Sequence, residues 1–234
     1  MHAPLEPSAP SRMAIGGAAL TIAGVILSGP IGFLLVSFVH PPGTWDGAAA
    51  FARDFRAIDA APFAAGFGLI LGWVMLVAGI ASMASPATRP RATVAVIFTA
   101  VFAALITFNY ICQTTLVPGL ARAYRPEYDG IIATFSMANP LSLSWGIEMW
   151  GYACLGVATW FLADVFARGR LERMIAALMR ANGVVSLAAA VLYAVRHDWP
   201  LGIAGFVAYC IWNVLVFVLA GLVVIALRAR RQPV

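Results

Sequence analysis

The sequence predicts an all-α protein, a polytopic transmembrane bundle of six helices. Of its 234 residues, 62% are hydrophobic and only 11% are charged, whereas a soluble domain carries roughly 25% charged residues. A soluble core cannot take up so many apolar side chains, but lipid can. Six apolar stretches also reach the roughly 20 residues that a helix needs to cross a bilayer. In lipid such stretches must be helical, because the backbone can pair only within its own segment.

The predicted spans define one helical domain between two short tails. We expect a single transmembrane domain over 13–228, a cytoplasmic N-terminal tail over 1–12 and a basic C-terminal tail over 229–234. The first span is longer than the apolar region of a cleavable signal peptide, so we expect it to stay in the protein. The six spans cover residues 13–39, 63–84, 92–117, 141–164, 174–195 and 201–227.

Arginine placement predicts the orientation of the bundle. All fifteen basic residues are arginine. With the N-terminus in the cytoplasm, nine lie inside, five lie outside and Arg180 lies within the fifth span. Arginine is enriched on the cytoplasmic side of membrane proteins. We therefore expect both termini in the cytoplasm. The inside group is Arg12, Arg89, Arg91, Arg168, Arg170, Arg173, Arg228, Arg230 and Arg231, and the outside group is Arg53, Arg56, Arg122, Arg125 and Arg196.

The same basic residues indicate the compartment and exclude one class of partner. The lack of lysine, with abundant Ala, Gly and Pro, indicates a GC-rich bacterial genome and hence the bacterial inner membrane. The arginines sit in short loops and tails rather than on a face interleaved with aromatic residues, so no nucleic-acid partner is expected.

Two external loops are long enough to hold structure. In the first, residues 43–62, Phe51, Phe55 and Ile58 recur at helical spacing, which predicts a short amphipathic helix. That helix would lie in the outer headgroup layer or pack on the bundle. The second loop ends at Pro140, which fits the first turn of the fourth span, with Asn139 as its N-cap.

Small residues and one proline mark packing features of the first two spans. Gly24, Ser28 and Gly32 form a small-residue stripe in the first span, and Gly68 and Gly72 form a GxxxG pair in the second. These stripes can serve a homodimer, contact another membrane protein, or pack the two spans on each other. Pro30 is expected to kink the first span.

The polar residue that stands out is Glu148, about eight residues into the fourth span. A side chain this short cannot reach the membrane surface, so the carboxyl group must face the bundle. There it would accept hydrogen bonds or hold its proton. We predict one intramembrane polar cluster, lined by Glu148, Asn109, Gln113, Asn213, Trp145, Tyr152, Tyr110 and Tyr209. Such a cluster could hold helices together, line a ligand pocket, or conduct protons or ions.

The other intramembrane polar residues have simpler interpretations. Asp164 is expected to pair with Arg168 one turn later, and Arg180 to reach the cytoplasmic surface. Asn182 would make a helix–helix contact. The cysteines, Cys112, Cys154 and Cys210, lack CxxC spacing and are expected to be buried small hydrophobic residues.

Motifs of several enzyme classes are missing from the sequence. The chain has no GxxxxGK[ST] loop, no GxSxG turn, no HExxH and no cluster of histidines, so we expect no metal and no cofactor.

Two resemblances accompany these features. The run "NPLSLSWGIEMWGYACLGVATWFLAD", with "AAPFAAGFGLILGWVML" and "FNYICQTTLVP" before it, resembles a bacterial family of six-helix integral membrane proteins of unknown function. That resemblance covers most of the chain and implies no catalytic residue. The segment "YCIWNVLVF", with Trp212 beside Asn213, is similar to membrane sterol isomerases, whose five-span bundles line a lipid pocket with acids, Asn and Trp. Those proteins have further His and Glu residues that this sequence lacks.

Three functions are compatible with the sequence. The first is a non-catalytic accessory or scaffold-type subunit of the bacterial inner membrane. The second is a lipid- or small-hydrophobe-binding protein, or a cofactor-free enzyme that uses Glu148 as acid or base. The third is a small transporter, although the two halves of the chain show no internal repeat.

Overall fold

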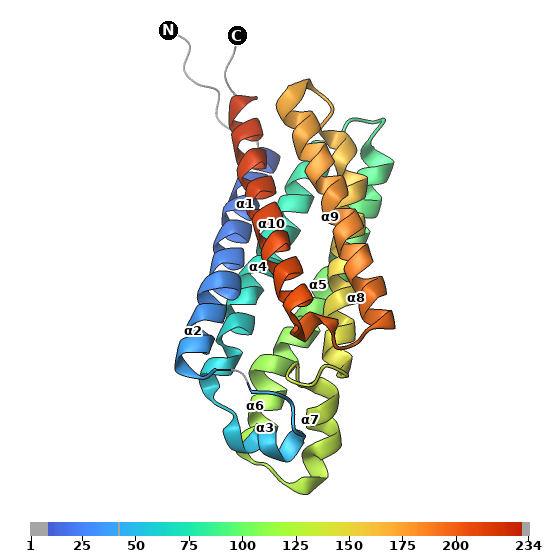
Figure 1. Ribbon diagram of the computed structural model, residues 1–234. Helices are drawn as coiled ribbons and strands as arrows, with labels where there is room; N and C mark the ends of the chain where they lie inside the picture. Colours follow the sequence, from blue (N-terminus) through green and yellow to red (C-terminus); the bar gives the residue numbers. More distant parts are fainter. Residues whose placement is uncertain (1–8, 42, 231–234) are drawn as a thin grey trace.

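The computed structural model describes residues 9–41 and 43–230, and this part of the chain is helical with no β-strand. Residues 1–8 of the predicted N-terminal tail and 231–234 of the predicted C-terminal tail, Arg231 included, lie outside it. Long helices form an elongated bundle (Figure 1). They are α1 (Ala9–Ile26) with its continuation α2 (Gly32–Val39), α4 (Ala61–Ala81), α5 (Arg89–Ile111), α8 (Leu143–Leu162), α9 (Gly169–Val195) and α10 (Ile203–Ala229).

Five helical stretches of the described chain are long and apolar enough to cross a membrane, which makes this a multi-pass membrane protein by composition. They are Ser11–Val39, Ala57–Ala81, Arg89–Arg122, Gly169–Val195 and Ile203–Ala229. Each overlaps one of the predicted spans. The predicted fourth span corresponds to α8, which is not among the five because Glu148, Tyr152 and several small residues lower its hydropathy. On this criterion the count of six spans stays a prediction.

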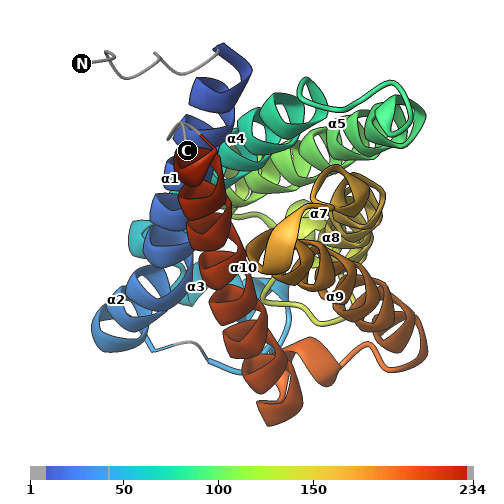
Figure 2. The same cartoon turned by 90° about the horizontal axis from the view of Figure 1, so that it is seen from above.

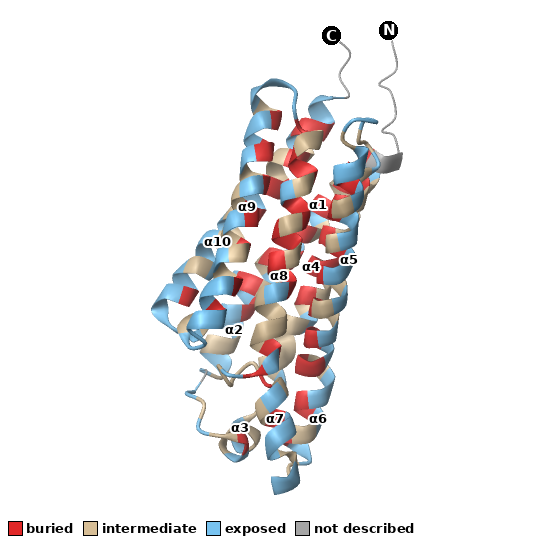
Figure 3. Ribbon diagram, turned by 90° about the vertical axis from the view of Figure 1, so that its right-hand side faces the viewer, coloured by how far each residue is buried: buried red, intermediate tan, exposed pale blue. Residues whose placement is uncertain are grey.

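The helices form two groups that meet along the bundle. One group pairs α1 with α4, the other places α8 between α5 and α9, and α4 contacts α5 to join them. Viewed from above, α10 crosses the bundle obliquely and contacts both α1 and α9 (Figure 2). Buried residues line the faces that the helices turn toward one another, and the outer faces are exposed (Figure 3). Large apolar side chains such as Phe38 and Ile203 are more than four-fifths exposed, as expected of lipid-facing positions.

The two ends of the bundle differ in structure. The first turn of α1 and the last turn of α10 lie at the same end (Figure 1). At the opposite end, three short helices form a cap: α3 (Ala48–Asp54), α6 (Val117–Arg122) and α7 (Asp129–Phe135). We call these three helices the cap below. α3 contacts both α6 and α7, so the cap is one packed unit.

The predicted kink at Pro30 is confirmed. A π-helical turn over Leu27–Ile31 separates α1 from α2, and Gly29 in it has non-helical angles, φ −84° and ψ −107°. Proline removes one backbone donor and its ring collides with the preceding turn, so the helix bends there.

Glycines of the first two spans bring α1 and α4 into backbone contact. A Cβ atom added at Gly24 would lie 2.6 Å from the backbone of Leu69, and one at Gly72 would lie 2.5 Å from the backbone nitrogen of Thr21. Gly68 differs, because its Cβ would lie 3.8 Å from a Leu20 methyl group, an ordinary contact. Gly24 and Gly72 therefore serve packing within the chain.

The first external loop does not form the single amphipathic helix that its pattern predicts. α3 ends at Asp54, and the backbone at Phe55 is extended, with φ −56° and ψ 133°, before a short 3-10 turn, Ala57–Ala60. The aromatic rings nevertheless gather, with Phe51 5.9 Å from Trp45 and 5.7 Å from Phe55 between ring centroids. α3 packs against α6 and α7, and the helical spacing of the loop residues alone does not predict contacts with such distant segments.

The start of α8 is also different from the prediction. The N-cap is Ser142, whose hydroxyl accepts a hydrogen bond from the backbone of Trp145 at 3.4 Å. Asn139 instead holds the preceding turn: its Oδ1 accepts from the Leu141 backbone at 3.1 Å and its Nδ2 donates to the Ala133 carbonyl at 2.7 Å. With its side chain committed to this turn, Asn139 cannot cap the helix, and Pro140 lies before the first turn.

Candidate functional site

Glu148 is half-buried on α8 and faces α5. Two neighbouring residues of α5 bind its carboxylate, one at each oxygen. Asn109 donates from Nδ2 to Oε2 at 2.9 Å, and the Tyr110 hydroxyl donates to Oε1 at 3.2 Å. Glu148 forms no ion pair with the described part of the chain, so neutral donors alone hold this acid.

The ring of Tyr110 is itself held in place by α4. A Cβ atom at Gly66 would lie 2.2 Å from the Tyr110 ring, so only glycine leaves room for it there. Phe63 and Phe67 contact the same ring edge-on, with centroids 5.5 and 6.1 Å away. The Tyr110 hydroxyl is also 3.3 Å from that of Tyr152, one turn after Glu148 on α8. Three helices thus fix the position of the phenol that binds the carboxylate.

Gln113 belongs to a second part of the cluster, which reaches the segment between α7 and α8. It lies in a π-helical turn, Cys112–Leu116, that follows α5. Its Nε2 donates to the Phe135 carbonyl at 2.7 Å and to Ser144 Oγ at 3.1 Å, and its Oε1 accepts from the Met137 backbone at 3.2 Å. Gln113 therefore attaches the segment after α7, and with it the cap, to the bundle, and does not bind Glu148.

Asn109 and Ser144 connect the two parts. Asn109 Nδ2 donates to the Ser144 carbonyl at 3.2 Å as well as to Glu148, and its Oδ1 lies 3.4 Å from Gln113 Nε2. The Ser144 hydroxyl donates to the Phe135 carbonyl at 2.7 Å. Ser144 was not among the predicted residues, although it lies one turn before Glu148 on the same helical face, which is a signal the sequence does contain.

The other predicted members lie at the edge of this cluster. The indole of Trp145 donates to the Met137 carbonyl at 2.8 Å rather than to Glu148, and so also holds the segment before α8. Tyr209 of α10 forms no hydrogen bond with Glu148 in the described chain, and its hydroxyl would lie 3.2 Å from a Cβ atom added at Gly29. Asn213 is turned away: its Nδ2 donates to the Tyr209 carbonyl at 2.7 Å. Its Oδ1 lies against the kink in the first span, where a Cβ atom added at Gly29 would lie only 2.5 Å away.

A separate polar contact joins α8, α9 and α10. Asn182 donates to Thr159 Oγ1 at 3.0 Å and accepts from the Trp212 indole at 3.0 Å. The Trp212 ring in turn contacts the Tyr152 ring, at 5.0 Å between centroids. The predicted helix–helix contact of Asn182 is confirmed, and the aromatic pair places it next to the Glu148 cluster.

Asp164 is paired differently from the prediction. It forms ion pairs with Arg91 of α5 and with Arg180 of α9, the second at 2.7 Å, and not with Arg168. The helical spacing that predicted Arg168 does not exist, because α8 ends at Leu162 and a 3-10 turn, Ala163–Val165, follows it. The neighbouring helices supply the cations instead.

The cysteines follow the prediction in part. None of the three is in a disulfide, and Cys112 is buried. Cys154 is half-buried and Cys210 is exposed on α10, so the expectation that all three are buried is wrong. α10 crosses the bundle obliquely (Figure 2), and Cys210 lies on its exposed face.

The hydrogen bonds of Glu148 join α8 to α5. Both carboxylate oxygens are occupied by neutral donors, and no nucleophile paired with a base is found among the described residues of the cluster. Two cavities of about 650 and 520 Å³ lie elsewhere and neither is lined by Glu148. In the described residues no group of three or more His, Cys, Asp or Glu side chains is placed to hold a metal ion.

No protein-family model, curated protein or solved structure matches this chain. The resemblances drawn from the sequence motifs stay predictions.

Proposed function

We propose that the protein is a non-catalytic accessory or scaffold-type subunit of the bacterial inner membrane, with six spans and both termini in the cytoplasm. The observation that carries this proposal is the hydrogen bonding of the Glu148 carboxylate. Each oxygen of the one acid deep in α8 already accepts a hydrogen bond, and the donors come from α5. A polar group that is satisfied within the bundle contributes to helix association without a ligand.

The polar cluster also connects the cap to the bundle. Gln113, Ser144 and Trp145 bind backbone groups of residues 135–137, just after α7. The cap and the bundle are thereby held in one relative position. A rigid outer surface of this kind is what a partner protein needs for stable docking, because little ordering entropy is then lost on binding.

A sixth span formed by α8 agrees with its length and surroundings. Its 20 residues correspond to about 30 Å at 1.5 Å per residue, the thickness of the hydrocarbon core. The polar side chains that lower its hydropathy, Glu148 and Tyr152, bind α5. α8 therefore need not present them to lipid.

The proposed orientation depends on the positive-inside rule. The end of the bundle where α1 begins and α10 ends carries the larger group of arginines, which predicts the cytoplasmic side. The cap would then lie outside. For a homodimer or a partner protein, Gly24 and Gly72 are poor candidates, because they already contact α4 and α1 within the chain.

A second candidate, binding of a small hydrophobic molecule beside Glu148, has one observation in its favour. Glu148 is only half-buried, and Tyr209 next to it is 40% exposed. An apolar ligand with one hydroxyl or amide could therefore approach the carboxylate from the α10 side.

One experiment separates the two functions. The wild type and Glu148→Gln are purified in nanodiscs and compared by native mass spectrometry and thermal unfolding. The control is Thr99→Val, at a buried polar residue of α5 whose hydroxyl donates to the Ala95 carbonyl of the same helix. The scaffold function predicts that bound molecules and partner subunits are the same in all three, and that Glu148→Gln lowers only the melting temperature. A small molecule retained by the wild type and Thr99→Val but lost from Glu148→Gln would replace the scaffold proposal by the second candidate.

A further inference from the structure

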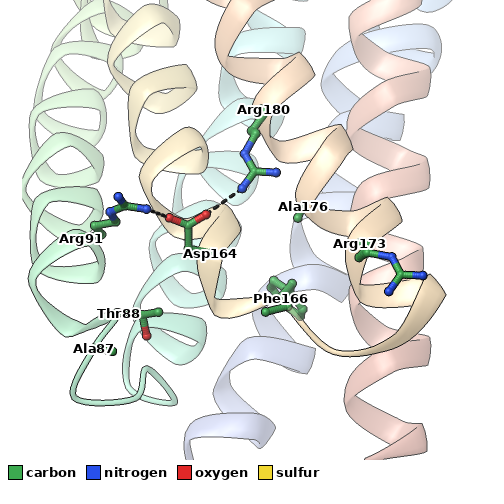
Figure 4. Close-up of a pocket in the computed structure, with 9 residues that line it drawn as sticks. Ala87, Thr88, Arg91, Asp164, Phe166, Arg173, Ala176 and Arg180 are labelled. Carbon is green, nitrogen blue, oxygen red and sulfur yellow. Dashed lines mark hydrogen bonds and ion pairs between the residues drawn. The ribbon is translucent and has the colours of Figure 1, made fainter.

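The second polar feature of the molecule lies at the other end of α8, far from the cap. A cavity of about 650 Å³ opens between the start of α5, the segment after α8 and the first turns of α9 (Figure 4). Three arginines and one acid line it: Arg91, Arg173, Arg180 and Asp164. With one negative charge against three positive ones, the lining has a net charge of +2.

Most of the donors in this cavity are unused. Arg91 and Arg180 reach the two oxygens of Asp164 from opposite sides (Figure 4). Each uses one N–H for this contact, and a guanidinium group has five. Arg173 forms no hydrogen bond or ion pair with any described residue. The ion pair thus holds two guanidinium groups in place while leaving donors for a further anion.

The nearest other acid does not neutralise the cavity. Glu172 precedes Arg173, but its carboxylate accepts from the Arg230 side chain, at 2.7 Å from Nη2, and from the Arg168 backbone at 2.7 Å. Arg230 also lies over the ring of Phe166, which lines the cavity, 5.4 Å from its centroid. Glu172 and Arg230 form a pair with no net charge, so the net charge of +2 in the lining is not neutralised by Glu172.

The start of α5 faces the cavity, as does the end of α8, where Asp164 is already paired with arginine. Ala87 and Thr88, just before the first turn of α5, line the cavity. The start of a helix carries a partial positive charge and favours anions. Buried Phe166 and Ala176 form an apolar wall beside the arginines.

We propose that this cavity binds a phosphate group, as the headgroup of an anionic phospholipid or as a soluble phosphate. Guanidinium groups match the geometry of phosphate oxygens and bind them through paired N–H donors. The volume is in the range of small-ligand sites. A basic pocket between membrane helices at the cytoplasmic side is the usual place for an anionic lipid headgroup, and an apolar wall beside the arginines suits the glycerol and the first acyl carbons.

The test compares two arginines that differ only in whether they line the cavity. Arg173 lines it, and Arg170, three residues earlier on α9 and also exposed, does not. Wild type, Arg173→Gln, Arg91→Gln and Arg170→Gln are reconstituted in nanodiscs of phosphatidylcholine with phosphatidylglycerol, and retained lipid is counted by native mass spectrometry. We expect the wild type and Arg170→Gln to retain phosphatidylglycerol. Arg173→Gln and Arg91→Gln should retain it about tenfold less, which is ~1.4 kcal/mol.

A second arm distinguishes the source of the phosphate. The same four proteins in phosphatidylcholine alone are heated with and without inorganic phosphate, with chloride at equal ionic strength as the reference. Stabilisation by inorganic phosphate that depends on Arg173 but not on Arg170, without retained phosphatidylglycerol, supports the site and assigns it to a soluble phosphate. Equal behaviour of Arg173→Gln and Arg170→Gln in both arms overturns the proposal. Neither arm involves Glu148, so this result is independent of the scaffold proposal.

Discussion

Replacing Gln113 by leucine tests whether the cap is held by hydrogen bonds to the π-helical turn that follows α5. Leucine has nearly the same volume and no polar atom, so the change removes the contacts without opening a large cavity. Gln113 is buried and makes three contacts of 3.2 Å or less, to the Phe135 carbonyl, the Ser144 hydroxyl and the Met137 backbone nitrogen. Ser144 still binds the Phe135 carbonyl in the variant, but the Met137 N–H loses its partner.

The expected loss follows from these contacts. Interhelical hydrogen bonds in membrane proteins are worth roughly 0.6–1 kcal/mol each, so three of them amount to about 2–3 kcal/mol. The measurement is reversible unfolding in mixed micelles, with Thr99→Val as the control. Thr99 is buried on the same helix, but its hydroxyl only donates to the Ala95 carbonyl within α5, so its loss should be well under 1 kcal/mol.

Proteolysis gives a second readout of the same variant. If Gln113 holds the segment after α7, then Gln113→Leu should make residues 136–142 several times more sensitive to protease, and Thr99→Val should leave them unchanged. A loss of stability no larger than that of the control, with unchanged proteolysis, would refute the role of Gln113.

Three further predictions address other parts of the structure. Gly72→Ala should destabilise the protein by about 1–3 kcal/mol in the same unfolding assay, because its Cβ would meet the backbone of Thr21, whereas Gly68→Ala should have little effect; equal losses would contradict the α1–α4 contact. In a cysteine-free variant, single cysteines at Leu141 and Ala167, both exposed and on either side of α8, should react with a membrane-impermeant maleimide from opposite sides, and labelling from the same side would exclude α8 as a span. Tyr124, outside the spans, donates to Asp129 at 2.7 Å, which raises the pKa of Tyr124 above the ordinary value of about 10. The stabilisation from this hydrogen bond is present at neutral pH and lost as pH rises through the raised pKa, so the ultraviolet titration of the wild type minus that of Tyr124→Phe should show one tyrosine that ionises above pH 10, and a difference centred at or below pH 10 would contradict the contact.

Much of the architecture follows from the sequence because the membrane constrains it strongly. Apolar length alone locates five spans, and the local chemistry of Pro30 locates the kink. The contact of Asn109 with Glu148 could also be predicted, because a deep acid without a cation needs a neutral donor, and few are available.

The parts that could not be predicted depend on residues far apart in the sequence. Asp164 pairs with Arg91, 73 residues away, rather than with Arg168 on the same chain segment. Glu172 likewise meets Arg230 at the end of α10. An arginine side chain is long enough to reach any of several carboxylates. The path of the loops determines which of these carboxylates lies close enough to form an ion pair.

The role of Gln113 illustrates the same limit within the cluster. Helical spacing places Gln113 on the face of Asn109, one turn away, which suggests that both bind Glu148. In the structure Gln113 lies in a π-helical turn, and its side chain binds the backbone groups of Phe135 and Met137 instead of Glu148. Backbone groups that act as hydrogen-bond partners cannot be identified from the side-chain types in a sequence.

The most direct test of the account is the coupling energy between Asn109 and Glu148. Unfolding free energies are measured for Asn109→Leu, Glu148→Leu and the double variant, and the lipids and subunits that each retains are recorded by native mass spectrometry. Because the 2.9 Å contact between these residues joins α5 to α8, the account predicts a coupling of roughly 1 kcal/mol, with retained molecules unchanged. Additive effects on stability, with a retained molecule lost whenever Glu148 is replaced, would contradict it.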